Sequence, residues 1–183
     1  MALITPSEHI LRDGRTLTVR SVAPDEAPEL IAYLNAISTE SEFLGFSPGE
    51  LTMTIEEERQ FIERCGASPG AIAMAGFVDD SIVASLTFLV GFKSRTRHLG
   101  ELGMSVRQAF WGLGVGTAMA GTFIEWAHQE PSVTKVNLRV RTDNQRALAI
   151  YRRYGFSVEG TLRRDICVDG RYFDHYAMGL LVD

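Results

Sequence analysis

The segment Trp111-Gly-Leu-Gly-Val-Gly-Thr117 places a glycine at every second position between a predicted strand and a predicted helix. Glycine has no Cβ atom, so the backbone of such a turn can approach an anion closely and direct successive N–H groups at it. The positive end of the following helix adds to this attraction. The segment therefore predicts a phosphate-binding turn, with a geometry that suits a pyrophosphate. A turn rich in glycine only for close helix packing is the alternative.

The spacing of these glycines excludes two common nucleotide-binding motifs. A P-loop, G-x-x-x-x-G-K-S/T, requires a Lys after its last glycine, and no Lys follows here. A dinucleotide-binding turn, G-x-G-x-x-G/A, would have Thr117 or Met119 at its third small position. The acidic residue expected about 20 positions further on is missing as well. The turn is therefore predicted to hold a pyrophosphate of another kind.

The order of strands and helices around this turn predicts a mixed α/β fold. A helix is predicted to begin at Pro24 and Asp25, and another directly follows the glycines. Asp79 and Asp80 lie in a predicted hairpin turn, so the strands around them and the strand before the glycines form an antiparallel meander. Seven strands are predicted, over residues 16–20, 71–78, 82–89, 101–106, 133–140, 156–167 and 172–181.

Polar and glycine residues mark the ends of two further helices. Thr54 and Glu57 have the spacing of a capping box, and Gly66 is expected to end the helix that they begin. Asp143 or Asn144 is expected to cap a helix that ends at Gly155, where a left-handed residue is typical. The turn Val168-Asp-Gly170 then joins the last two strands.

Length and composition predict one domain, over residues 1–183, with no linker or internal repeat. The chain has 18 Lys and Arg against 23 Asp and Glu, a net charge of −5, so nucleic acid is not expected as a partner. Its two cysteines lack the spacing of a zinc site, and no metal is expected. No signal peptide or membrane-spanning run is apparent, so we expect a cytoplasmic protein without a membrane partner.

Three segments in the right order resemble the GNAT superfamily of N-acetyltransferases. The family's cofactor turn, Gln/Arg-x-x-Gly-x-Gly/Ala, matches Gly114 and Gly116, while Trp111 departs from the pattern and leaves the backbone donors unchanged. Residues 138–147 and Tyr151-Arg-Arg-Tyr-Gly-Phe156 are similar to the family's fifth strand, Asn-capped helix and Tyr-x-x-x-Gly-Phe segment. The resemblance covers residues 16–182. It implies a mostly antiparallel seven-stranded sheet that is splayed between its fourth and fifth strands, with helices on both faces.

The resemblance implies acetyl-CoA as cosubstrate and assigns residues to it. Backbone groups of the fourth strand would bind the pantetheine arm as an added strand does. The turn's N–H groups would hold the pyrophosphate, and Asn144 would face the cofactor, cap its helix, or do both. The predicted cofactor-binding residues are Met104, Ser105, Val106, Gly112, Leu113, Gly114, Val115, Gly116, Thr117, Asn144 and Tyr151.

Acetyl transfer requires a neutral amine, a stabilised oxyanion and a proton for the departing thiolate. Tyr151 matches the family tyrosine beside the sulfur and is predicted to be the acid, although its helix position also suits a core aromatic. The backbone N–H of Met104 is predicted to polarise the thioester carbonyl. Some relatives carry a Glu base where this chain has Arg139, which cannot accept a proton. Glu101 is therefore the predicted base, with a solvated strand-end carboxylate as the alternative; His98 and the pair Asp174-His175 on the last strand are further candidates, each with a surface or structural role as the alternative.

The function predicted first is acetylation of the primary amine of a small molecule or amino acid, which fits the acidic composition. Acetylation of protein N-termini, or a catalytically silent acetyl-CoA-binding module, are the alternatives. The acceptor pocket is predicted from residues 33–46 and 165–175. A monomer and a homodimer both stay open. Charged or aromatic residues considered for the pocket are Glu40, Glu42, Phe43, Arg139, Arg141 and Arg164.

Overall fold

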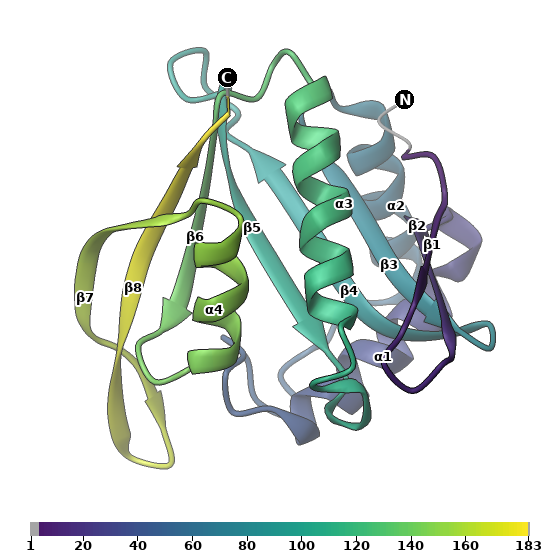
Figure 1. Cartoon of the computed structure of the whole chain (residues 1–183), viewed down its shortest axis with the longest axis horizontal. Coiled ribbons are helices and arrows are strands. Elements are labelled where there is room, and N and C mark those ends of the chain that lie inside the picture. Colours follow the sequence, from purple (N-terminus) through teal and green to yellow (C-terminus); the bar gives the residue numbers. More distant parts are fainter. Residues whose placement is uncertain (1–3, 183) are drawn as a thin grey trace.

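The computed structural model describes residues 4–182, which form one mixed sheet flanked by helices (Figure 1). The strand order is β1-β2-β3-β4-β5-β6-β8-β7, and every neighbouring pair is antiparallel except β5 and β6, which are parallel. The strands are β1 Ser7–Ile10, β2 Thr16–Ser21, β3 Ile72–Val78, β4 Ser81–Val90, β5 Leu99–Val106, β6 Lys135–Arg141, β7 Ser157–Val168 and β8 Arg171–Leu181. The α-helices are α1 Ala27–Glu40, α2 Ile55–Ala67, α3 Val115–Gln129 and α4 Gln145–Arg153, with short 3₁₀ turns η1 Pro24–Glu26 and η2 Gln108–Phe110.

The prediction of seven strands was wrong, because the sheet has an eighth strand at its N-terminal edge. This strand, β1, pairs with β2 from Ser7↔Val19 to Ile10↔Thr16. Gly14, in the left-handed region at φ +88°, allows the tight turn that joins them. The sequence signal is weak because β1 has four residues, three of them polar or titratable, so it lacks a run of alternating apolar residues.

Two hydrophobic cores cover the two faces of the sheet, as β3 illustrates. Every residue of β3 is buried. Met74 packs with the core beneath α3 and α4, whereas its neighbours Ala75 and Phe77 pack with the core beneath α1 and α2. Figure 1 shows α3 and α4 in front of the sheet and α1 and α2 behind it. The predicted arrangement, with helices on both faces, is confirmed.

Local capping signals mark the start of α2 and both ends of α4, but the expected end of α2 at Gly66 was wrong, because this helix continues to Ala67 with Ser68 as its C-cap. The Thr54 hydroxyl accepts a hydrogen bond from the Glu57 N–H at 3.2 Å, and the Glu57 carboxylate accepts one from the Thr54 N–H at 2.7 Å. Asn144 caps α4 by accepting from the Ala147 N–H at 3.2 Å. Gly155 follows α4 with a φ of +89°. These contacts confirm the predicted capping box, Asn cap and left-handed glycine.

The sheet opens between β5 and β6. These strands pair only over Leu99↔Lys135, Gly100↔Val136 and Glu101↔Asn137. Beyond that point β5 continues to Val106 and β6 to Arg141 without pairing to each other. The predicted splay is therefore present, and it leaves backbone groups on both strands free for another partner.

Within residues 4–182, no helix combines the length and the apolar character needed to cross a membrane.

Candidate active site

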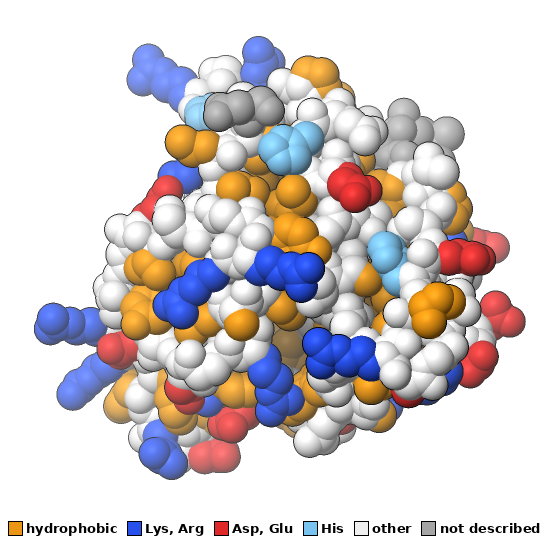
Figure 2. All heavy atoms as spheres, viewed as in Figure 1, with side chains coloured by type: hydrophobic (Ala, Val, Ile, Leu, Met, Phe, Trp, Pro, Cys, Tyr) orange, Lys and Arg blue, Asp and Glu red, His pale blue; other side chains and the backbone are white. Residues whose placement is uncertain are grey.

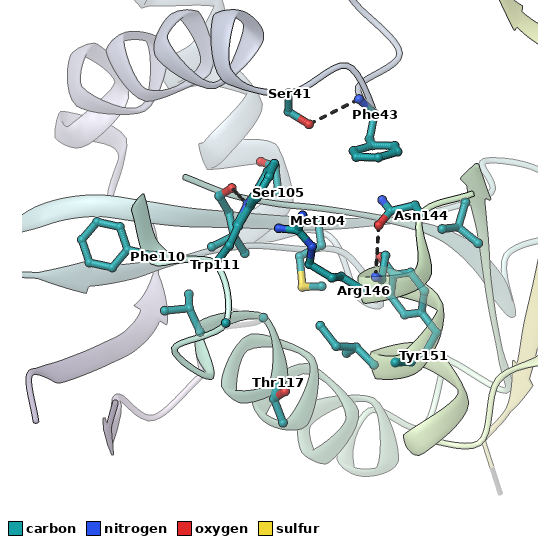
Figure 3. Close-up of a pocket in the computed structure, with 18 of the residues that line it drawn as sticks. Ser41, Phe43, Met104, Ser105, Phe110, Trp111, Thr117, Asn144, Arg146 and Tyr151 are labelled. Atoms are coloured by element: carbon teal, nitrogen blue, oxygen red, sulfur yellow. Dashed lines mark hydrogen bonds between the residues drawn. The ribbon is translucent and has the colours of Figure 1, made fainter. Parts of the chain in front are cut away.

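A cavity of about 500 Å³ opens where β5 and β6 separate. In Figure 3, Ser41 and Phe43 lie on one side of β5, and Thr117 and Tyr151 lie on the other. The cavity therefore extends through the opened sheet and is lined from both of its faces. Most of the predicted site residues line it: Met104, Ser105, Val106, Gly112, Gly114, Val115, Gly116, Thr117, Asn144 and Tyr151.

The glycine turn lies at the edge of this cavity and begins α3. Gly112 and Gly114 have φ values of +78° and +103°, which L side chains rarely adopt, and Gly114 is the residue before the helix. Residues 115–117 form the first turn of α3, so their N–H groups have no acceptor within the helix. The turn therefore presents several backbone donors and a positive helix end to the same space.

The chain's N-terminal hairpin holds this turn in place. The Arg12 N–H donates to the Leu113 carbonyl at 3.1 Å, and the Arg12 guanidinium donates to the Gly112 carbonyl at 3.0 Å. Arg12 also lines the cavity. The hairpin between β1 and β2 thus fixes the carbonyls of the turn from outside and adds a cation beside its N–H groups. Leu113, a predicted cofactor-binding residue, does not line the cavity.

The opened edge of β5 offers backbone donors at alternate residues. The Arg107 N–H donates to the Val83 carbonyl, and the Gly91 N–H donates to the Leu99 carbonyl. Because backbone hydrogen bonds in an antiparallel pair recur at every second residue, the odd-numbered residues of β5 direct their backbone N–H and C=O groups at β4. Met104 and Val106 consequently direct their backbone groups at the gap. Ser105 instead lines the cavity, and its hydroxyl lies 2.9 Å from the Tyr33 hydroxyl.

Trp111, which departs from the family pattern, has a specific place in the cavity wall. Its indole N–H donates to the Val106 carbonyl at 2.8 Å, so it takes up one of the free acceptors of the opened edge. The Arg146 guanidinium lies 4.3 Å from the centre of the indole ring, in a cation–π contact. Figure 2 shows Lys and Arg side chains around a hollow between α4 and the start of α3. This edge of the cavity is therefore cationic.

Close packing between α3 and α4 determines the shape of this wall. A Cβ atom on Gly116 would lie 2.9 Å from Ile150 Cδ1, and one on Gly121 would lie 2.7 Å from the Tyr154 hydroxyl. That hydroxyl donates to the Thr117 carbonyl at 2.8 Å. Glycine at 116 therefore serves close helix packing, while Gly112 and Gly114 meet no such neighbour, so helix packing alone does not explain the glycine-rich turn.

Tyr151 reaches the cavity from α4 and is almost completely buried, with 5% of its surface exposed. Its ring makes an edge contact with Phe156 at a centroid distance of 5.6 Å. Burial raises the pKa of the Tyr151 phenol to about 12. The side chain is thus both a core aromatic and a neutral O–H group at the cavity.

The segment after α1 closes the other side of the cavity through Arg141. The Arg141 guanidinium lies between the rings of Phe43 and Phe173, at 4.4 and 3.9 Å from their centres. It also makes two hydrogen bonds of 2.8 Å to Asp143 and one of 3.0 Å to the Glu42 carbonyl. The hydrogen bond from Arg141 lowers the pKa of Asp143. Arg141 therefore fixes residues 41–44 over the end of β6.

Glu40 also has a structural contact rather than a place in the cavity wall. Its carboxylate accepts from the Arg107 guanidinium at 2.7 Å and from the Gln108 N–H at 2.8 Å. It thereby ties the end of α1 to the segment after β5. Neither Glu40 nor Glu42 lines the cavity, whereas Phe43 does.

Glu101, the predicted base, is the last residue of β5 that pairs with β6, and it does not line the cavity. Its exposed carboxylate is 3.7 Å from the guanidinium of Arg139, which does line the cavity. Arg139 is in turn 3.6 Å from the carboxylate of Asp165. The His175 Nδ1 atom is 3.1 Å from this carboxylate, but without the geometry of a hydrogen bond. Acidic, basic and imidazole groups therefore gather beside the cavity.

Comparison with known sequences identifies the family. The chain matches the sequence model of the family described as Acetyltransferase (GNAT) domain over residues 16–157. The chain belongs to the GNAT acetyltransferase family. This acetyltransferase is 31% identical over 116 residues to the L-amino acid N-acetyltransferase AaaT of Escherichia coli (strain K12), an alignment that covers 63% of the chain and 72% of AaaT. It is 27% identical over 117 residues to the spermidine N(1)-acetyltransferase of the same organism, covering 64% of the chain and 55% of that enzyme.

Solved structures agree with this assignment. A GNAT-family acetyltransferase from Streptococcus pneumoniae superposes with a TM-score of 0.88 at 29% identity, covering 91% of this acetyltransferase and 99% of that chain. The protein yncA from Salmonella typhimurium, solved with acetyl-CoA, superposes with a TM-score of 0.79 at 15% identity, and the match covers 91% of this acetyltransferase and 94% of that chain. The second likeness shows the shared fold alone.

Sequence reasoning missed two cations of the cavity in this acetyltransferase, Arg12 and Arg146. Arg12 comes from a hairpin about 100 residues from the turn, and no local pattern signals that contact. Arg146 carries a weak signal, because a cation in the first turn of a helix opposes the helix dipole and so requires another partner. Neither His98 nor His175 lines the cavity, and Arg164 lies outside it as well.

Proposed function

We propose that this acetyltransferase transfers the acetyl group of acetyl-CoA to the primary amine of a small molecule, an amino acid in the first place. The main support for the proposal is the cavity through the opened sheet, because acetyl-CoA and the amine could enter it from opposite faces of the sheet and meet inside it. The donor enters from the side of α3 and α4. The acceptor enters from the side of α1 and residues 41–44.

The chain's own groups fit acetyl-CoA on the donor side. The N–H groups of residues 114–117 and the cations of Arg12 and Arg146 would hold its phosphates. Met104 and Val106 would hydrogen-bond the pantetheine arm in place of the missing strand neighbour. Because Trp111 already occupies the Val106 carbonyl, the arm would depend on the remaining groups of these two residues.

When bound, acetyl-CoA supplies an activated acyl group and a thiol leaving group. The Met104 N–H is directed at the gap and would stabilise the oxyanion that forms at the thioester carbonyl. Tyr151 would give its proton to the departing thiolate, because a phenol is protonated at physiological pH and burial raises the pKa of this one further. Glu101, beside Arg139, would accept the proton that the ammonium group of the acceptor loses, directly or through water.

Closure of the acceptor side favours a small molecule over a protein N-terminus. Residues 41–44 are fixed onto the end of β6 by the Arg141 guanidinium, whose side chain is only 2% exposed. Ile37, Ser41, Phe43 and Leu44 form this wall of the cavity. An extended peptide would have to displace that wall, whereas an amino acid would not. The names of the two E. coli relatives, which specify an amino acid and a polyamine, support the same class of acceptor.

A screen of acceptors tests the proposal. Purified protein is mixed with acetyl-CoA and one acceptor at a time: the twenty L-amino acids, spermidine, and peptides with free N-termini. Thiol release is followed, and product masses are measured. We expect N-acetylated amino acids as the preferred products. Peptide acetylation at higher kcat/KM than any amino acid would overturn the assignment of the acceptor, and binding of acetyl-CoA without transfer to any amine would support a silent binding module.

A further inference from the structure

Arg139 is a cation of the cavity wall with weak partners among residues 4–182. Its side chain is 56% exposed, and its guanidinium makes no hydrogen bond within this described part of the chain. Its contacts with Glu101 and Asp165 are 3.7 and 3.6 Å, longer than the 2.7–2.9 Å of a charge-assisted hydrogen bond. Exposed ion pairs of this kind contribute little and are readily exchanged. The guanidinium is therefore available to bind an anionic ligand through shorter hydrogen bonds.

The other arginines that line the cavity already have defined partners. Arg141 is saturated by Asp143, the Glu42 carbonyl and two aromatic rings. Arg12 donates to the Gly112 carbonyl, and Arg146 is stacked on Trp111 beside the glycine turn. Among the described arginines that line the cavity, Arg139 is thus the one held by neither a hydrogen bond nor a stacked aromatic ring.

The position of Arg139 places it on the acceptor side. It alternates along β6 with Leu138 and Val140, which pack in the core beneath α3 and α4, so its side chain leaves the opposite face of the sheet. Arg139 lies two residues beyond Asn137, the last residue of β6 that pairs with β5, so it stands where the strands part.

We propose that Arg139 binds the carboxylate of an amino-acid acceptor and so determines the preference for acids over simple amines. This inference rests on the proposed function. A guanidinium beside two carboxylates complements a zwitterion, because Arg139 pairs with the carboxylate while Glu101 or Asp165 faces the ammonium group. The carboxylate replaces the long contacts of Arg139, and this exchange releases Glu101 to take the proton that the amine must lose.

Pairs of acceptors that differ only at the carboxylate test this inference. The best of the twenty L-amino acids is compared with its own α-amide, which keeps the amine and side chain and lacks the negative charge. Because the α-amide has the more acidic ammonium group, kcat/KM is calculated per unprotonated amine. For the native protein we expect this value to be on the order of 30-fold higher for the acid, a size typical of a hydrogen bond to a charged group. In Arg139→Gln this ratio should fall to about 1 through a loss on the acid alone, and Arg139→Lys should retain part of it.

A matched control and a binding measurement separate this role from a structural one. Arg163→Gln removes the same charge from an exposed site on β7 outside the cavity and should leave the ratio unchanged. Calorimetry with the N-acetyl amino acid product on the CoA-loaded protein should detect binding to the native protein and to Arg163→Gln, and no binding to Arg139→Gln. CoA affinity should be equal in all three.

Two different results would contradict the two proposals separately. Equal kcat/KM for acid and amide in the native protein, or an unchanged ratio in Arg139→Gln, would overturn the role of Arg139 while leaving amine acetylation intact. Absence of thiol release with every amino acid, every amide and spermidine would overturn the proposed function itself.

Discussion

Replacing Gly114 by alanine should weaken CoA binding far more than it weakens the fold. Gly114 has a φ of +103°, and an added Cβ would meet no atom within 4 Å, so the cost is conformational strain of roughly 1–2 kcal/mol. The turn can relieve this strain by rotating away from positive φ. Such a rotation turns the N–H groups of residues 115 and 116 away from the phosphates. Loss of one hydrogen bond to a charged group costs about 1.5–3 kcal/mol, or roughly 10- to 150-fold in Kd.

Gly170→Ala provides the matched control for this prediction. Gly170 has a φ of +77°, also has no neighbour within 4 Å of an added Cβ, and lies in the turn between β7 and β8, away from the cavity. Urea unfolding should give similar losses of stability for the two variants. Isothermal titration with CoA should give a native Kd for Gly170→Ala and a Kd at least ten-fold higher for Gly114→Ala. A native Kd in Gly114→Ala, together with the same loss of stability as in Gly170→Ala, would refute the role of the turn.

Three further substitutions test the chemistry and the acceptor wall. Tyr151→Phe should lower kcat by ten-fold or more without changing CoA affinity, since the variant loses a proton donor; unchanged turnover at saturating acetyl-CoA would remove Tyr151 from the mechanism. Because burial raises the pKa of Tyr151 to about 12, native kcat should show no loss through tyrosine ionisation between about pH 8 and 10, and an alkaline limb abolished in Tyr151→Phe would contradict this. Glu101→Gln should lower kcat with little change in CoA affinity, and a native pH–rate profile in this variant would contradict its role as base. Asp143→Asn should lower the Tm at pH 7, because the variant loses the ion pair with Arg141. Arg141 lowers the pKa of Asp143 in the folded state, so the ion pair stabilises the fold above the unfolded-state pKa of about 4. This stabilisation is lost as the pH falls through the folded-state pKa. The Tm difference from native protein should therefore shrink toward pH 3, and a constant difference would refute this cause.

The residues of the donor side could largely be predicted from the sequence, because local rules determine them. Positive φ requires glycine at Gly112 and Gly114, and an Asn side chain at a helix start makes the bond seen at Asn144. These signals depend on neighbours within a few residues. Leu113 was placed with them by continuity along the turn, but it lies outside the cavity wall, with its carbonyl accepting from Arg12.

The acceptor side could not be predicted in the same way, because contacts between distant segments form it. The position of Arg141 between Phe43 and Phe173 joins parts of the chain about 100 and 30 residues away from it. Its burial depends on that stacking, and a strand sequence alone does not distinguish it from the half-exposed Arg139 two residues earlier. The eighth strand was missed for a related reason, since β1 is short and polar and is stabilised by pairing with β2.

A crystal structure with acetyl-CoA bound tests the central claim most directly. The account predicts the pantetheine arm between β5 and β6, a hydrogen bond from the Met104 N–H, and phosphate oxygens within hydrogen-bonding distance of the N–H groups of residues 114–117. The thioester should lie beside the Tyr151 hydroxyl. Phosphates bound away from the start of α3, or an arm that does not enter the gap between β5 and β6, would contradict the account.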